Sequence, residues 1–283
     1  MKVLISVDIE GIGGVFNVQQ TRAGNAEYEQ ARRWMTLEAN AAVEGAFSGG
    51  ASEVWVNDSH GGFNNLLLDE IDARARVILG KPRMLGKPRM LGMMAGLEHR
   101  PALVFMIGYH AMAQSRGMLA HTINSFAFAR VLVDGVATGE AGLYGALAQE
   151  YGARVALLSG DDVFEGETRP AFPDAKFVVV KRAGGHASGD LLTPAASRER
   201  LRDAAREAAG QVARDGEWWD RACAAPRMRT CELHTQTNAL ADLFAQWPGV
   251  ERTAGCVIRF AAPTAEALVR TLNSLSAMSA VLR

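Results

Sequence analysis

The chain has few cysteines and no sign of a disulfide framework. Three cysteines occur in 283 residues. Their number is odd, and Cys223, Cys231 and Cys256 show no C-x-x-C spacing, which argues against paired disulfides. Cysteines scattered in this way are typical of small buried apolar residues in a reducing compartment. We therefore expect a cytoplasmic protein.

Long apolar runs and an excess of either charge are also lacking. No stretch of about 18 apolar residues occurs, which excludes a membrane-spanning helix. The N-terminal apolar run, VLISV at 3–7, is too short for a signal or transit peptide. Lys and Arg total 30 against 31 for Asp and Glu, so bulk charge favours neither nucleic acid nor a membrane as partner. We expect the ligand to be recognised locally.

Short β-rich runs alternate with helical stretches through the first two thirds of the chain. The runs lie at 3–7, 53–57, 76–80, 102–108, 154–160 and 177–181. Helices are expected at 25–47, closed by glycines, and at 194–214, which is rich in alanine and charged residues. The alternation predicts an α/β fold, with a three-layer α/β/α main domain around a mostly parallel sheet.

The last third of the chain has a different pattern. Strand, helix, strand and helix are expected in turn at 229–234, 238–246, 256–261 and 265–278. We interpret them as a smaller C-terminal α+β unit. The expected domains are a metal-binding catalytic domain at 1–190 and, at 191–283, the helix with the α+β subdomain.

The hexapeptide KPRMLG occurs twice in succession, at 81–86 and 87–92. Six residues are too few for a solenoid repeat, which needs roughly 20 or more. A tandem duplication that lengthens a surface loop explains it, since loops tolerate added length at little cost. A basic binding loop is the alternative.

Two carboxylates follow the first expected strand. Asp8 and Glu10 lie at its end, and strand alternation points them the same way. Neighbouring carboxylates repel each other unless a cation lies between them, so a metal explains the pair better than a salt bridge does. A merely solvated pair at a strand end is the alternative.

Two histidines follow other strands, His60 after 53–57 and His110 after 102–108. Because the carboxyl ends of strands in open α/β sheets meet at the ligand crevice, we expect both to converge on the carboxylate pair. One histidine alone would more often be structural, but two beside a carboxylate pair indicate ligands. Glu140, at the first turn of a helix, is a further candidate, although it would also suit the helix dipole. Such mixed donors favour zinc.

The glycines that follow Asp8 offer a competing interpretation. Gly11, Gly13 and Gly14 resemble a dinucleotide-binding turn. A pyrophosphate there would face Asp8 and Glu10, and the repulsion between like charges is costly. We therefore interpret the glycines as backbone that passes close to a metal site.

Taken together, these motifs resemble those of the D-aminopeptidase (DppA) family of zinc metallopeptidases. The order is SVDIEG at 6–11, VNDSH at 56–60, GYHA at 108–111, GMLAHT at 117–122 and GEAGL at 139–143. The resemblance runs nearly from end to end, and five motifs in order are far more specific than one. The departures are the doubled KPRMLG and GGHASG at 184–189, and both bear on the choice of substrate.

The resemblance implies a dinuclear site with two zinc ions per subunit. Asp8 would bridge the ions, with Glu10, His60, His110 and Glu140 as further ligands. His121 in GMLAHT would be the catalytic residue, as nucleophile or base. The family further implies a ring-shaped homo-oligomer, a decamer, whose enclosed active sites admit only short peptides. Family substrates begin with a D-residue such as D-alanine, although relatives that handle other amino-terminal residues are known.

The predicted function is metal-assisted hydrolysis of the first peptide bond, with His121 moving the proton to the leaving amine. His99, His186 and His234 are expected to be structural or surface residues. Two alternatives stay open. The zinc ligands could serve an aminopeptidase or amidohydrolase acting on L- or other amino-terminal amides, or the chain could be a dipeptide-binding module without catalysis.

Overall fold

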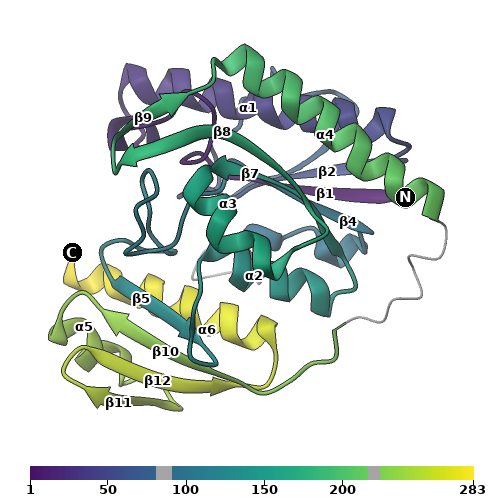
Figure 1. Cartoon of the computed structure of the whole chain (residues 1–283). Coiled ribbons are helices and arrows are strands. Elements are labelled where there is room, and N and C mark those ends of the chain that lie inside the picture. Colours follow the sequence, from purple (N-terminus) through teal and green to yellow (C-terminus); the bar gives the residue numbers. More distant parts are fainter. Residues whose placement is uncertain (81–90, 216–223) are drawn as a thin grey trace.

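A seven-stranded sheet, sheet A, lies at the centre of the computed structural model, which describes residues 1–80, 91–215 and 224–283 (Figure 1). The strand order is β3-β2-β1-β4-β7-β8-β9. All neighbours are parallel except β8 and β9. The strands are β1 (Lys2–Val7), β2 (Glu53–Asp58), β3 (Arg76–Ile78), β4 (Leu103–Ile107), β7 (Arg154–Asp161), β8 (Lys176–Gly185) and β9 (Ser188–Leu191). The predicted mostly parallel sheet is confirmed.

Helices cover both faces of sheet A (Figure 1). On one face, α1 (Ala26–Ser48) and α4 (Pro194–Asp215) pack against each other. On the other face lie α2 (Glu140–Glu150) and α3 (Asp162–Thr168). Both faces of β1 are buried, since Val3, Ile5 and Val7 belong to one of the hydrophobic clusters that flank the sheet, and Leu4 and the buried Ser6 face the other side. A parallel strand buried on both sides requires this pattern, and the predicted three-layer fold is confirmed.

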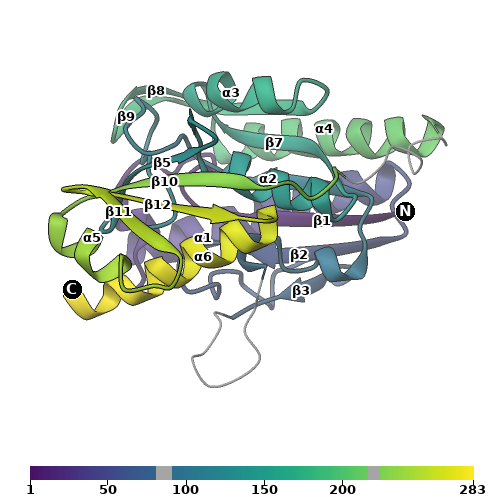
Figure 2. The same ribbon diagram turned by 90° about the horizontal axis from the view of Figure 1, so that it is seen from below.

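A second sheet, sheet B, is entirely antiparallel and has the order β11-β12-β10-β5-β6. It lies on the side of α2 away from the centre of sheet A, with α5 and α6 (Figures 1 and 2). The elements are β5 (Phe128–Val133), β6 (Val136–Ala137), β10 (Arg229–Thr235), α5 (Asn238–Phe244), β11 (Val250–Ala254), β12 (Val257–Ala262) and α6 (Ala265–Met278). The expected α+β unit is therefore present.

The two sheets do not follow a single cut in the sequence. Strands β5 and β6 come from the middle of the chain but pair within sheet B. Conversely, α4 follows residue 190 but packs on α1 over sheet A. The division into 1–190 and 191–283 stays a prediction. Each of these three elements packs with the part of the protein on the other side of that division.

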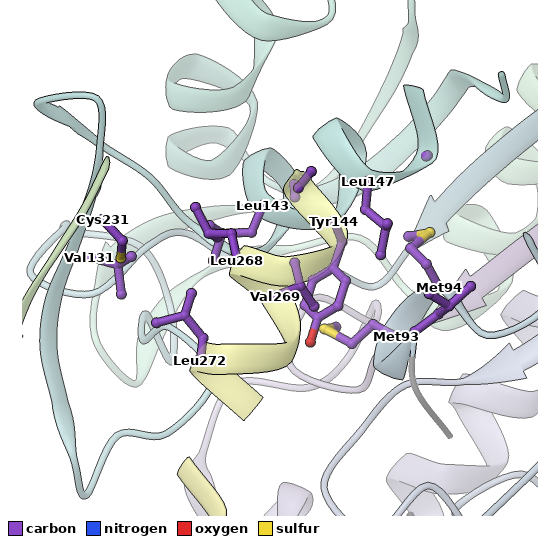
Figure 3. Packing of buried hydrophobic residues seen from close by; sticks show 14 of the residues in the cluster. Met93, Met94, Val131, Leu143, Tyr144, Leu147, Cys231, Leu268, Val269 and Leu272 are labelled. Atoms are coloured by element: carbon purple, nitrogen blue, oxygen red, sulfur yellow. The ribbon is translucent and has the colours of Figure 1, made fainter. Parts of the chain in front are cut away.

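A continuous apolar core joins sheet B to sheet A. Figure 3 shows α6 residues Leu268, Val269 and Leu272 against α2 residues Leu143 and Leu147. The same cluster includes Val131 and Cys231 of sheet B. It also includes Met93 and Met94, which directly follow the second KPRMLG copy. Burial of this surface away from water holds the two sheets in one arrangement.

The doubled KPRMLG spans the edge of the described region. Residues 81–90 lie outside the described residues, so the loop prediction stays untested, and the last two residues, Leu91 and Gly92, are buried. Cys223 also lies outside the described residues. Within the described ranges, no helix combines the length and apolarity that crossing a membrane requires.

Glu38 is a buried carboxyl group on α1, behind the turn that follows β1. Its Oε1 accepts hydrogen bonds from Gly13 N–H at 2.9 Å and Ser197 Oγ at 2.6 Å. Its Oε2 has no hydrogen-bond partner in the part of the chain that the structure describes. Burial raises the pKa of Glu38 from 4.5 to about 7, although Ser197, Gly13 and Lys181 oppose the shift.

This raised pKa predicts a pH-dependent effect of Glu38→Gln. Between pH 4.5 and about 7 the folded state binds more protons than the unfolded state, so native stability falls as the pH rises through that window. Glutamine stays neutral throughout. The free energy of unfolding of the wild type minus that of Glu38→Gln should therefore increase by at most about 3 kcal/mol as the pH is lowered from about 8.5 to about 5. The difference between the two melting temperatures, measured across this range, follows the change.

Glu44→Gln is the matched control, since Glu44 lies on the same helix and forms an exposed ion pair with Arg202. Its difference from the wild type should change little with pH. A Glu38→Gln difference that is equally flat would show that the carboxyl group is ionised in the folded protein across this range.

Candidate metal centre

Three of the predicted ligands lie at the carboxyl ends of neighbouring strands. Asp8, His60 and His110 follow β1, β2 and β4, which are adjacent in sheet A. The strand order reverses between β1 and β4, since β2 and β3 lie on one side of β1 and the later strands on the other. Open α/β sheets form their ligand crevice at such a switch point. Glu10 lies in the turn after β1, and Glu140 begins α2.

The structure brings these five side chains together. His60 Nε2 lies 3.3 Å from Glu10 Oε1. His110 Nε2 lies 3.6 Å from Asp8 Oδ2 and 3.5 Å from Glu140 Oε1. Two sets of ligand atoms each fit within 4.8 Å, one from Asp8, Glu10 and His110, the other from His110, His121 and Glu140. His110 belongs to both sets, while the bridging role of Asp8 stays a prediction.

Hydrogen bonds fix the orientation of the three histidine rings. Nδ1 lies 3.2 Å from Asn65 Oδ1 in His60, 3.0 Å from the Ala111 carbonyl in His110 and 2.9 Å from the Leu119 carbonyl in His121. Because these oxygens only accept hydrogen bonds, each Nδ1 carries the proton. Each Nε2 is thus directed at a carboxylate, an arrangement typical of histidines that bind metal.

Asp58 and Asn65 support His60, and the sequence analysis did not single out either. Asp58 accepts hydrogen bonds from the backbone N–H groups of Asn65 and Leu66 at 2.6 and 2.8 Å, and from Asn65 Nδ2 at 2.8 Å. Tyr28 Oη also donates to Asn65 Oδ1 at 2.8 Å. The available signal was the turn-rich segment NDSHGGFNN, in which such side chains commonly bond to the backbone.

The cluster is crowded with buried negative charge. Burial, together with the charges of Glu10 and Glu140, raises the pKa of Asp8 well above its usual value. Burial alone would lower the pKa of His60 and His110, but Glu10 and Glu140 outweigh it and raise both to about 10. Without a metal the cluster therefore holds protons, and a cation would have to displace them. Metal affinity is expected to fall as the pH falls.

Two atoms of the cluster lack a hydrogen-bond partner among the described residues, Glu10 Oε2 and His110 Nε2. A buried polar atom left unpaired costs about 1–3 kcal/mol. A cation bound between the carboxylates and imidazoles would supply the missing interaction to both. Carboxylate oxygen and imidazole nitrogen are donors that zinc accepts readily, so the residues present fit this metal.

His121 lies at the solvent-facing edge of the cluster. Its ring stacks on that of His110, with centroids 4.1 Å apart and planes inclined by 9°. Its Nε2 lies 3.9 Å from Glu140 Oε1, and its side chain is 24% exposed against 4% for Glu140. Burial, followed by the charge of His110, lowers the pKa of His121. A neutral imidazole at the mouth of the site is suited to accept a proton.

The loop that carries His121 is held in a strained conformation. Gln114, Leu119 and Ile123 have positive φ angles of 69°, 54° and 61°, which are rare for such residues and most of all for a β-branched one. Glu140 accepts a 2.6 Å hydrogen bond from Ile123 N–H, and Asp161 accepts one of 2.6 Å from the Met118 N–H. Strain that surrounding contacts maintain is a common feature of functional sites.

The three remaining histidines lie outside the cluster. His99 stacks on Trp55 at 3.6 Å, and His234 Nε2 lies 2.9 Å from Glu232 Oε1. His186 contributes its backbone carbonyl, which accepts a hydrogen bond from Leu119 N–H at 3.0 Å. The GGHASG turn therefore supports the loop of His121.

Lys181 is a buried cation behind the cluster. Its ammonium group donates to the backbone carbonyl of Val15 at 2.6 Å and also to those of Glu10 and Ile12. Burial lowers its pKa to about 8 despite the opposing charge of Asp161. These bonds fix the turn that positions Glu10. In the sequence, nothing distinguishes this lysine from a surface residue at a strand end.

Comparison with known proteins identifies the family. A profile of the D-aminopeptidase family, Peptidase M55, matches residues 1–274. A D-aminopeptidase of Bacillus subtilis (strain 168) is 32% identical over 195 residues, which is 69% of each chain. The solved structure of the Zn-dependent D-aminopeptidase DppA from Bacillus subtilis, a self-compartmentalizing protease, has a TM-score of 0.88 at 26% identity and covers 99% of this chain and 98% of that chain. The resemblance of the motifs is confirmed, and this chain belongs to the D-aminopeptidase family of peptidases.

Proposed function

We propose that this chain is a zinc-dependent aminopeptidase that removes the N-terminal residue, with D-residues preferred, from short peptides. The supporting observation is the buried cluster of three carboxylates and two histidines at the switch point of sheet A, in which Glu10 Oε2 and His110 Nε2 have no partner among the described residues. The zinc dependence of the similar solved structure agrees with this donor set, and the D-aminopeptidase activity of both similar proteins supports the preference for D-residues.

Two zinc ions per subunit would be held by Asp8, Glu10, His60, His110 and Glu140. Zinc would supply a Lewis acid for the substrate carbonyl and would lower the pKa of a water molecule toward about 7. The free amino group of the peptide would be held at this cluster, by a zinc or by a site carboxylate, which would favour cleavage of the first peptide bond over internal ones.

His121 would serve as the proton-transfer residue. Its Nδ1 is engaged by the Leu119 carbonyl, so its Nε2 is free to take a proton at the mouth of the site and deliver it to the leaving amine. The strained loop holds the ring in place, and its stacking on His110 limits rotation. Good orientation of such a group accounts for a large part of catalytic rate.

We further propose that the protein acts as a cytoplasmic homo-oligomer, a decamer, that encloses its active sites. The self-compartmentalizing relative motivates the assembly. The two described cysteines are unpaired, which suits a reducing compartment. Light scattering would give the size of the assembly, and a monomer at micromolar concentration would contradict the proposal.

One experiment tests the activity and the metal together. We expect close to two zinc ions per chain in purified protein, faster hydrolysis of D-Ala-D-Ala than of L-Ala-L-Ala, and loss of activity on chelation that added zinc restores. Hydrolysis of other amides but of neither dipeptide would favour the amidohydrolase. Tight dipeptide binding without turnover by the zinc-loaded protein would favour a binding module. Full activity with one zinc per chain would overturn the dinuclear site.

A further inference from the structure

A small cavity of about 180 Å³ adjoins His121 on the side of sheet B. Besides His121, it is lined by Phe128 and three alanines, Ala113, Ala120 and Ala129, and by the uncharged polar residues Gln114, Ser125 and Gln236. Phe128 and Ala129 belong to β5, so the cavity lies between the loop of His121 and the second sheet.

The wall of this cavity is firmly supported. Phe128 is only 1% exposed and packs edge-on against Phe244 of α5, with ring centroids 6.1 Å apart. Gln236 Nε2 donates to the carbonyl oxygens of Ser125 and Phe128 at 3.2 and 3.4 Å. A wall held in this way does not yield easily to a larger group, since packed interiors resist overfilling.

His121 separates the candidate metal ligands from the cavity. None of Asp8, Glu10, His60, His110 or Glu140 is among the described residues that line it, whereas His121 lines it and also faces Glu140. In the proposed function, the ligand cluster receives the amino end of the peptide and His121 stands at the bond to be broken. The part of the peptide after that bond therefore lies on the side of the cavity.

We propose that this cavity is the subsite for the side chain of the residue that follows the scissile bond, and that it selects an uncharged side chain no larger than a phenyl ring. The inference rests on the proposed function. The volume of about 180 Å³ exceeds the roughly 150 Å³ of an apolar cavity that holds benzene, so a side chain with one aromatic ring fits. Apart from His121, no ionisable side chain is among the described lining residues, so a charged side chain would lose hydration without gaining a partner.

Ala129→Leu, which fills the cavity from β5, tests this assignment. The substrates are D-alanine amide, whose leaving group has no side chain, and dipeptides of D-alanine followed by alanine, phenylalanine, glutamate or lysine in either chirality. In the wild type, kcat/KM should fall at least about tenfold from phenylalanine to glutamate or lysine at the second position, because a charge in the cavity gains no partner. In Ala129→Leu, the ratio of kcat/KM for the phenylalanine dipeptide to that for the amide should fall at least about tenfold, because the added side chain takes up the space of the ring.

Arg130→Leu is the matched control, because Arg130 follows Ala129 on β5, is exposed and is not among the described residues that line the cavity. It should leave that ratio unchanged. Ala129→Val provides a smaller filling, with an intermediate effect expected, if the leucine variant does not fold. An equal loss for amide and dipeptide, or an unchanged ratio in a folded variant, overturns the subsite. A wild type that hydrolyses no substrate overturns the proposed function instead.

Discussion

His110→Ala should lose bound zinc and, with it, nearly all peptide hydrolysis. His110 Nε2 faces Asp8 at 3.6 Å and Glu140 at 3.5 Å, and it takes part in both groups of ligand atoms. Its removal therefore affects both metal positions. A bound metal contributes several kcal/mol to such a reaction, and about 4 kcal/mol corresponds to a loss of roughly 10³-fold in kcat/KM.

Zinc content measured beside kcat/KM, with circular dichroism to verify folding, decides this prediction. His234→Ala is the matched control, since His234 pairs with Glu232 on sheet B away from the cluster. That variant should keep both zinc and activity. If His110→Ala instead retains two zinc ions and normal turnover, His110 is not a ligand.

His121→Ala should keep its zinc but lose roughly 10²- to 10⁴-fold in kcat, which is the usual contribution of a positioned proton-transfer group. His121 is the most exposed member of the cluster, and its Nε2 is 3.9 Å from the carboxylate oxygen Oε1 of Glu140. Loss of its ring leaves the contacts between His110, Asp8 and Glu140 in place.

The geometry also makes a different outcome informative. His121, His110 and Glu140 present ligand atoms within 4.8 Å of one another. If His121→Ala loses about one zinc ion per chain together with its activity, His121 is a ligand. Wild-type turnover in this variant would remove it from the mechanism.

Buried strands were predictable from the sequence, whereas several strands of the second sheet were not. β1 and β4 are runs of apolar residues with both faces covered. β5 includes the exposed Arg130, and β11 is mostly exposed and polar. The strand conformation of β5 depends on β10, a partner distant in the sequence, and that of β11 depends on pairing with its neighbour β12. Such pairing leaves little trace in a local pattern.

The position of the candidate ligands was predictable because strand ends converge in this class of fold. His121 was different, since its loop has no periodic pattern, and only the resemblance to the family pointed to it. Lys181 and Asn65 were not singled out. Lys181 bonds to the carbonyl of Glu10, 171 residues away, and that proximity exists only in the folded chain.

The pairing of β5 also bears on the order in which the surroundings of His121 are completed during synthesis of the chain. The loop of His121 ends at β5, whose only partner nearby in the chain is the two-residue β6. Its other neighbour, β10, begins at residue 229. Contacts between such distant segments form late in folding, because a long loop must close first. During synthesis, most of the chain is made before residue 229 and the rest of β10 are available to pair with β5. A partly synthesised chain therefore contains all five candidate metal ligands but lacks the strand that supports β5 beside His121.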